Sequence, residues 1–208
     1  MAGKLKEDGM IDVLLKVLNL QAASAKNKPD RVIRELALQP GESVADIGAG
    51  GGYYALRFAR EVGHTGAVTA VDIEQEYLEF IAKSARKRGL RNLGTQLARG
   101  GGLELPDQSF NLIFLRNVFH DFRDPQRYFS KLKKSLKPGG RVAVIDFKYK
   151  PFTKEGMFGH YSDETRIVHV MKSCGFTHSR TFDFLPSQSF NIFLNDSQQK
   201  PGGTNDVY

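Results

Sequence analysis

The sequence predicts a single doubly wound α/β domain with a mostly parallel sheet, and three observations lead to this expectation. Between Ser43 and Phe147, short apolar runs alternate with segments of helical periodicity, as in parallel strands joined by crossover helices. A glycine-rich turn follows the first of these runs. The 208 residues are 40% hydrophobic and 25% charged, which is enough apolar material for one core without disulfides or a structural metal.

The first forty residues are expected to be helical. Their apolar side chains recur at helical spacing, at Ile11, Leu14, Leu15, Val17, Leu18 and Leu20. Asp30 is expected to cap a second short helix that runs through Ala37. Gln39-Pro40-Gly41-Glu42 is a turn sequence, so we expect residues 1–40 to form a helical lid or cap that precedes the main domain.

The main domain is expected to span residues 41–195. Its predicted parallel strands are Ser43 to Ile47, Ala67 to Val71, Leu93 to Ala98, Phe110 to Leu115 and Arg141 to Phe147. The predicted helices between them are Tyr53 to Val62, Ile73 to Gly89 and one that begins at Asp124. The last of these places Tyr128, Phe129, Leu132 and Leu136 on one face, and Lys137-Pro138-Gly139-Gly140 is expected to end it.

The pattern changes after the fifth strand. We expect a helix from Asp163 to Cys174, followed by β-rich segments at Thr177 to Leu185 and Ser189 to Leu194. Only Pro186-Ser187-Gln188 separates these two segments, which is short enough for an antiparallel hairpin. The polar segment 196–208 is expected to be a disordered tail.

Composition excludes several classes of protein. No run approaches the roughly 18 apolar residues of a membrane helix, and no apolar segment follows the lysines after Met1, so we expect a cytoplasmic protein without membrane insertion. Cys174 is the only cysteine, which excludes an internal disulfide and a thiolate-only metal site, and no metal is expected. The net charge of +7 would suit a polyanion, but the basic residues are dispersed among acids, which argues against a nucleic-acid partner.

The turn Gly48-Ala49-Gly50-Gly51-Gly52 lies between a predicted strand and a predicted helix, where backbone amides can surround a ligand. Taken alone, such a turn is equally a tight connection without a ligand. Tyr53 stands where a dinucleotide-binding turn needs a small residue, and no Lys-Ser or Lys-Thr pair follows for a P-loop. Asp46, just before the turn, could face the amino group of a methionine moiety.

A second acid supports a nucleoside ligand. Asp72 ends the second predicted strand, about 26 residues after Asp46, where a carboxylate can accept both hydroxyls of a ribose. The alternative is an acid that interacts favourably with the following helix N-terminus. Two acids at the ends of neighbouring strands are more informative than either one alone.

Four segments resemble class I S-adenosylmethionine-dependent methyltransferases. Val44 to Tyr54 resembles their motif I, Val68 to Ile73 their ribose-binding strand end, Leu105 to Asn111 the approach to their fourth strand, and Leu136 to Arg141 their Leu-Lys-Pro-Gly-Gly turn. The resemblance runs from about Lys28 to Phe193. It implies a Rossmann-like methyltransferase fold with a seven-stranded sheet and an antiparallel C-terminal strand pair.

The resemblance also implies S-adenosyl-L-methionine as cofactor and S-adenosyl-L-homocysteine as its product. The cofactor-binding residues that it implies are Asp46, Gly48, Ala49, Gly50, Gly52, Tyr53, Asp72, Ile73, Gly100, Gly101, Arg116 and Asn117. One departure is Ala98-Arg99-Gly100, where many relatives have Gly-Asp-Ala, because arginine cannot accept a hydrogen bond from the adenine amino group. Three explanations are open. Backbone atoms of Gly100 to Gly102 and stacking hold the adenine, the affinity for the cofactor is weaker than usual, or the site has changed use.

The reacting end of such a site is expected beyond the carboxyl ends of the strands, which directs attention to Arg116 through Asp121. His120 could act as a base or orient the acceptor, with Asp121 fixing its tautomer. The alternative is a histidine bonded to backbone in a loop. His160 and Tyr161, or the helix around Leu14 to Leu18, could close over the acceptor, although ordinary packing or loop hydrogen bonding is the favoured explanation of both.

Several acceptors can be argued against. Asn117-Val118-Phe119-His120 lacks the prolines of the loop that commonly directs methylation of nucleic-acid amino groups, and one cysteine is too few for an arsenite site. Leu115 to Val118 looks like the corresponding run of ubiquinone and menaquinone methyltransferases, which suggests a quinone-like or phenolic acceptor. We therefore expect methyl transfer to a small-molecule acceptor by a monomer or homodimer.

Two competing hypotheses remain at this point. A noncatalytic RNA- or protein-binding member of the same fold would account for Arg99. A nicotinamide-dependent dehydrogenase is contradicted by Tyr53.

Overall fold

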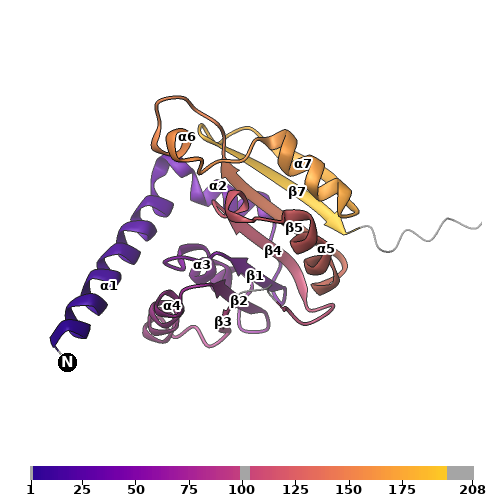
Figure 1. The fold of residues 1–208 in the computed structure, drawn as a ribbon. Helices are drawn as coiled ribbons and strands as arrows, with labels where there is room; N and C mark the ends of the chain where they lie inside the picture. Colours follow the sequence, from indigo (N-terminus) through magenta and orange to yellow (C-terminus); the bar gives the residue numbers. More distant parts are fainter. Residues whose placement is uncertain (1, 99–103, 196–208) are drawn as a thin grey trace, which may run out of the picture.

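The computed structural model describes residues 2–98 and 104–195 and contains one seven-stranded sheet (Figure 1). The strand order is β3-β2-β1-β4-β5-β7-β6. The strands are β1 (Ser43–Ile47), β2 (Ala67–Asp72), β3 (Leu93–Leu97), β4 (Phe110–Arg116), β5 (Leu136–Phe147), β6 (Phe176–Phe182) and β7 (Gln188–Asn195). β1 to β5 are parallel, whereas β7 is antiparallel to both β5 and β6. The predicted fold class and the antiparallel C-terminal pair are confirmed.

Helices cover both faces of this sheet, as the doubly wound prediction requires. The α-helices are α1 (Ala2–Ala23), α2 (Pro29–Leu36), α3 (Tyr53–Glu61), α4 (Gln75–Lys87), α5 (Pro125–Leu132), α6 (Lys154–Phe158) and α7 (Glu164–Ser173). Short 3-10 turns are η1 (Ala25–Asn27), η2 (Phe119–Asp121) and η3 (Lys133–Ser135). One buried cluster joins α2, α3 and α4 to the sheet, and a second joins α5 and α7 to the opposite face.

Strand periodicity explains the two clusters. Successive residues of a strand point to opposite faces. Val44 and Phe114 accordingly belong to the α3–α4 cluster, while Ala45 and Ile113 belong to the α5–α7 cluster. Because both faces of the central strands are covered by helices, these strands are nearly continuous runs of apolar residues.

The chain order creates a crevice at the carboxyl ends of β1 and β4. From β1 the chain moves outward through β2 to β3, and it then returns to place β4 on the other side of β1. The connections that leave β1 and β4 therefore diverge to opposite faces. In open α/β sheets this switch point is where ligands bind.

Two local predictions are wrong. The helix that begins after Asp124 ends at Leu132, and Leu136 belongs to β5, where it pairs with Phe110 and is buried. Lys137-Pro138-Gly139-Gly140 thus forms an irregularity inside a strand instead of a helix stop, with a register shift between Phe110 and Leu112. The pairing with β4 overrides the local helix signal.

The second correction concerns Asp30. It is not the N-cap of α2, because the helix begins at Pro29 and its cap position is Lys28, with a φ of 43°. Asp30 instead accepts a hydrogen bond from Arg57 Nη1 of α3 at 2.6 Å. The remaining predicted helices and strands are present, with ends that differ by a few residues.

The N-terminal helix α1 lies along α3 and α4 and extends past the edge of the sheet (Figure 1). Leu15 is fully buried, whereas Met10 and Leu20 are exposed. Residues 2–36 are helical apart from a short connection, as predicted, but their role as a lid stays a prediction. The predicted tail 196–208 lies outside the described residues. Within the described ranges, no helix is long and apolar enough to cross a bilayer.

Candidate active site

The glycine-rich turn connects β1 to α3 at the switch point. Gly48, Gly50 and Gly52 have φ values of 69°, 53° and 76°, a left-handed conformation that favours glycine. The backbone amides of Gly48 and Ala49 donate to the carbonyl of Val71 at 2.9 and 3.0 Å. The turn is therefore held against the end of β2.

Asp72 at the end of β2 binds this turn directly. Its Oδ2 accepts the backbone amide of Gly50 at 2.8 Å, and its Oδ1 accepts the amides of Ile73 at 2.8 Å and Glu74 at 3.2 Å. The sequence predicts that Asp72 binds a ribose, and the structure adds a role in positioning the loop. A carboxylate has about four lone-pair sites, so these three bonds leave capacity for a ligand hydroxyl.

A cavity of about 480 Å³ opens beside the turn, at the carboxyl ends of β1 and β4. Its floor and walls include Asp46, the turn from Gly48 to Gly51, Phe114, Arg116 and Asn117. The end of α1, η1, the start of α3 and three later segments, represented by Phe147, Glu155 and Ser187, complete the lining. This volume is within the usual range of about 300–1,000 Å³ for small-molecule sites.

Asp46 is 3% exposed and faces the cavity from the end of β1. The pKa of its carboxyl is raised from 3.8 to about 7, because burial, with a smaller contribution from the charge of Asp72, outweighs the backbone amide of Ala55 and the charge of Arg116. A buried carboxyl with so high a pKa is destabilised as an anion until a cation approaches it. Asp46 is therefore suited to receive a cationic ligand group.

Two donors with unused hydrogen-bonding capacity line the same cavity. The hydroxyl of Tyr54 and Nε of Arg116 are buried, and neither has a hydrogen-bond partner among the described residues. The Arg116 guanidinium lies 5.6 Å from the centroid of the Tyr54 ring. Burial raises the pKa of Tyr54 to about 12 and lowers that of Arg116, although Tyr54 and Asp46 partly restore the latter. Because buried polar groups are almost always bonded, these two groups indicate a polar ligand.

Helix α1 packs onto the outer side of the turn. Asn19 Nδ2 donates to the carbonyl of Gly51 at 2.7 Å. A Cβ placed on Gly51 would lie 2.5 Å from Asn19 Oδ1 and 2.6 Å from the carbonyl oxygen of Leu15, so only glycine permits this approach. The N-terminal helix is thus part of the wall around the glycine-rich turn.

His120 lies in η2, after β4, and its predicted partner is wrong. Its Nδ1 bonds Asp146 Oδ1 at 2.9 Å, and its backbone amide donates to Asp146 Oδ2 at 3.0 Å. Asp121 is farther away, with its Oδ1 3.6 Å from His120 Nε2. Asp146, not Asp121, therefore fixes the tautomer. Asp146 ends the apolar run of β5, and an acid in that position is the sequence signal that could have identified it.

The Asp146–His120 pair is almost enclosed by protein, since Asp146 is 0% exposed and the His120 side chain 7% exposed. Burial lowers the pKa of His120, but the hydrogen bond and charge of Asp146, with the charge of Asp121, outweigh it and raise the pKa. The His160 ring, from the segment after α6, lies 5.4 Å from the His120 ring, centroid to centroid, at an interplanar angle of 72°.

The structure brings together many, but not all, of the predicted site residues. Those that line the cavity are Asp46, Gly48, Ala49, Gly50, Tyr53, Arg116 and Asn117. Gly52, Asp72, Ile73, His120 and Asp121 do not line it, although Asp72 bonds the lining residue Gly50. The predicted residues Gly100 and Gly101 and the departure at Arg99 lie outside the described residues. Four site residues were not predicted from the sequence: Asn19, Tyr54, Asp146 and Gln188. Gln188 donates to Asn117 Oδ1.

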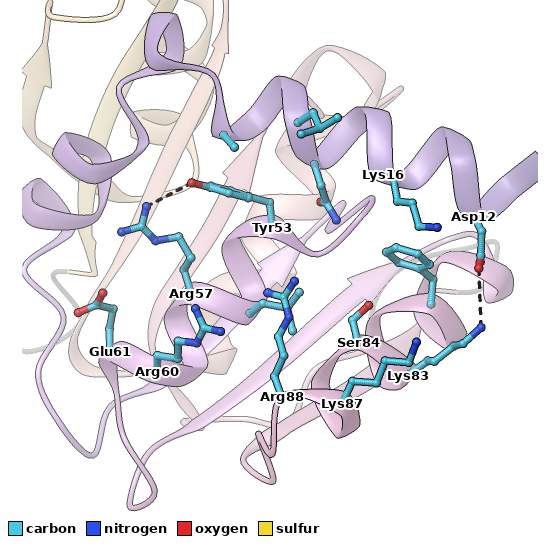
Figure 2. A pocket seen from close by; sticks show the side chains of 15 residues that line it. Asp12, Lys16, Tyr53, Arg57, Arg60, Glu61, Lys83, Ser84, Lys87 and Arg88 are labelled. Atoms are coloured by element: carbon cyan, nitrogen blue, oxygen red, sulfur yellow. Dashed lines mark hydrogen bonds and ion pairs between the residues drawn. The ribbon is translucent and has the colours of Figure 1, made fainter.

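A larger cavity of about 870 Å³ lies between α1 and helices α3 and α4 and shares Asn19 and Tyr53 with the smaller one (Figure 2). It is lined by Lys16, Arg57, Arg60, Lys83, Lys87 and Arg88, and by only two acids, Asp12 and Glu61. Figure 2 shows Asp12 paired with Lys83 across it, at 3.7 Å. The smaller cavity is the candidate active site because it contains the strand ends, the buried acid and the unpartnered donors.

Comparison with protein families decides which family this architecture represents. A family model described as a methyltransferase domain matches residues 38–199, which include every strand of the sheet. The chain belongs to this methyltransferase family. The matched residues include the β1–α3 turn and the acids Asp46 and Asp72 at the ends of β1 and β2.

Curated relatives of this methyltransferase-family chain match only in part. It is 34% identical over 110 residues to an arsenite methyltransferase of Halobacterium salinarum, which covers 53% of this chain and 28% of the relative. It is 31% identical over 121 residues to a ubiquinone/menaquinone biosynthesis C-methyltransferase of Psychromonas ingrahamii, covering 56% and 48%. The chain thus spans less than half the length of these two relatives.

Solved structures agree on the fold. An S-adenosylmethionine-dependent methyltransferase from Aquifex aeolicus matches with a TM-score of 0.80 and 24% identity, covering 88% of this chain and 97% of that one. The [4+2]-cyclase SpnF matches with a TM-score of 0.70 and 18% identity, covering 83% and 81%. The fold of this methyltransferase-family chain therefore supports more than one kind of chemistry, and its own function must be argued from the site.

Proposed function

We propose that this chain transfers the methyl group of S-adenosylmethionine to a small-molecule acceptor. The observation that carries the proposal is the meeting, in one cavity at the switch point, of a buried acid and two unpartnered buried donors: Asp46, Tyr54 and Arg116. A zwitterionic amino acid moiety has the complementary charges, an ammonium for Asp46 and a carboxylate for the two donors.

The other cofactor contacts follow from the same placement. Asp72 would accept ribose hydroxyls with the lone pairs that its three backbone bonds leave free. The exposed side chain of Ile73 would cover one face of the adenine. Ala49, Tyr53 and Asn117 would complete the wall, and the absence of side chains at Gly48 and Gly50 would allow the ligand to lie close to the turn.

The cofactor supplies an electrophilic methyl group on a sulfonium. The chain's own residues have to align an acceptor with that methyl group and exclude water. We assign His120 to orienting the acceptor, because the buried Asp146 holds its ring and leaves Nε2 on the side away from that carboxylate. Asp121 lies next to Nε2 and is the second proposed catalytic residue.

The curated relatives support a small-molecule acceptor, since their names refer to arsenite and to quinone biosynthesis. This chain has one cysteine, which is too few for an arsenite site built from thiolates. A quinone-like or phenolic acceptor therefore fits better. The larger basic cavity contains no residue from the strand ends. It does not favour a noncatalytic RNA-binding function over methyl transfer.

Calorimetric titration with S-adenosylhomocysteine tests the cofactor assignment. We expect micromolar or tighter binding that Asp72→Ala weakens about 10- to 100-fold, because bonds to a charged group are worth about 1.5–3 kcal/mol. Asp107→Ala, which removes an exposed acid in a turn, is the matched control and should bind normally. Absence of binding, or equal binding by the Asp72 and Asp107 variants, would contradict the proposal.

Turnover tests the acceptor side. Acceptors are screened with a radiolabelled methyl donor, and His120→Asn is then compared with the unmodified chain on the best one. We expect a rate lowered about 100-fold or more, with S-adenosylhomocysteine affinity unchanged. An unchanged rate in His120→Asn would remove His120 from the mechanism.

A further inference from the structure

Three side chains that the methyl-transfer proposal does not fully explain meet beyond the carboxyl ends of β4 and β5. His120 and Asp121 are in η2, and His160 follows α6, about forty residues later in the sequence. One ligand atom from each of these residues lies within 4.8 Å of the other two. We propose that His120, Asp121 and His160 bind a divalent first-row transition-metal ion, such as Zn²⁺.

The first support is the tautomer of His120. Asp146 is a fully buried carboxylate that also accepts the backbone amides of His120 at 3.0 Å and Phe147 at 2.8 Å. A carboxylate can only accept, so in a neutral His120 the proton is on Nδ1 and the lone pair is on Nε2. A histidine whose other nitrogen donates to a carboxylate is the usual outer-shell arrangement of metal ligands.

The second support is distance. Two atoms that are each about 2.1 Å from a tetrahedral zinc ion lie about 3.4 Å apart. His120 Nε2 and Asp121 Oδ1 are 3.6 Å apart, which already agrees with this value. His160 and Asp121 are both exposed, so their side chains can rotate by the remaining distance without repacking the core. His120, held by Asp146, is the fixed member of the set.

The ligand chemistry indicates the kind of ion. Imidazole nitrogens with one carboxylate suit zinc, iron and their neighbours, whereas calcium and magnesium prefer oxygen ligands. Three protein ligands also leave at least one coordination position open, as in catalytic metal sites. The sequence does not predict this site, because His120 and His160 are forty positions apart and form no local metal-binding motif.

The position of the cluster connects it to the proposed function. Asn117 precedes η2, Phe147 follows Asp146, and Glu155 precedes His160, and all three line the 480 Å³ cavity. If the methyl-transfer proposal holds, the open position would bind an acceptor hydroxyl or thiol as its anion, and the proton would pass to solvent. The methyl–sulfur bond of the donor would break as the new bond to that oxygen or sulfur forms. This extension rests on the proposed function, whereas the metal site itself does not.

The test uses the full chain after removal of any polyhistidine tag and of bound metal with a chelator. Zn²⁺ is titrated by calorimetry, and Co²⁺ is titrated in parallel because its visible absorption reports coordination. We expect one equivalent per chain. His160→Asn should weaken binding by about 10- to 100-fold or more, and Asp146→Asn, which removes the outer-shell carboxylate, by about 10- to 100-fold. His169→Asn, on the exposed face of α7, is the matched control and should bind as tightly as the unmodified chain.

Circular dichroism of each variant shows whether it is folded, and His160→Asn keeps the test valid if Asp146→Asn does not fold, since His160 is exposed. Absence of stoichiometric binding, or equal affinity in the His160 and His169 variants, would overturn the metal site and leave a hydrogen-bonded ion pair. S-adenosylhomocysteine is titrated into the same samples. If the chain binds S-adenosylhomocysteine but not Zn²⁺, only the metal site is refuted. If it binds Zn²⁺ but not S-adenosylhomocysteine, only the proposed function is refuted.

Discussion

Replacing Asp46 with asparagine should stabilise the fold and weaken the binding of S-adenosylhomocysteine. Burial raises the pKa of this carboxyl from 3.8 to about 7. Between these two pH values the folded state binds more protons than the unfolded state, so stability falls as pH rises through this window. Above pH 7 the full pKa shift lowers the free energy of unfolding by about 4 kcal/mol. Asparagine has nearly the same shape and no charge, and it removes this penalty.

The expected result is a difference that depends on pH. At pH 8 Asp46→Asn should unfold at a higher temperature than the unmodified chain, by up to roughly 8–16 °C for about 4 kcal/mol in a domain of this size. Near pH 4 the two proteins should have nearly equal stability. S-adenosylhomocysteine should bind the variant more weakly, because the proposed partner of the ligand ammonium has lost its charge.

Urea denaturation at several pH values, followed by circular dichroism, measures the difference directly. Asp107→Asn, at an exposed turn position, is the control and should leave the pH profile unchanged. If Asp46→Asn were no more stable than the unmodified chain at pH 8, the carboxyl would not be buried in the folded state as the structure shows. If its affinity for S-adenosylhomocysteine were unchanged, Asp46 would not contact the ligand.

Two further predictions concern the packing around the site. Gly51→Ala should cost about 1–3 kcal/mol, because its Cβ would meet Asn19 and the backbone of α1, while Gly94→Ala, with no atom near its added Cβ, should have little effect. Glu42→Gln should cost about 1–2 kcal/mol at neutral pH, because Arg141 donates to both Glu42 carboxylate oxygens at 2.9 and 3.0 Å. Burial raises the pKa of Glu42, but the hydrogen bonds from Arg141 and the Gln39 amide, together with the charges of Arg141 and Lys137, outweigh it and lower the pKa. This stabilisation is therefore present above pH 4.5 and disappears as the pH falls through the folded-state value.

Both predictions are checked by chemical denaturation. Limited proteolysis of Gly51→Ala should also show faster cleavage within α1, and equal cleavage of the Gly51 and Gly94 variants would contradict the close approach of α1 to the turn. For Glu42→Gln, the difference from the unmodified chain should shrink between pH 7 and pH 3. A difference that stayed constant over this range would show that the Glu42 charge does not contribute.

Local patterns were sufficient for most of the fold. The alternation of strands and helices, the turn from Gly48 to Gly52 and the acids at the ends of β1 and β2 depend on neighbouring residues and on short connections. Their prediction therefore required only the periodicity of each segment and the rule that parallel strands end at one edge of the sheet. On that basis the sequence predicts that Asp46 and Asp72 lie at the site.

Contacts between distant segments were decided by tertiary structure. Pairing with Phe110 placed Leu136 in a strand although its spacing fits the preceding helix. Parallel pairing of β4 with β5 brought Asp146 to His120, 26 positions earlier, so the sequence neighbour Asp121 was not its tightest partner. The approach of His160 depends on the path of the chain through α6. Residue patterns determine which segments are strands or helices, but strand register and loop paths determine which side chains meet, because those contacts become available only when the whole sheet has assembled.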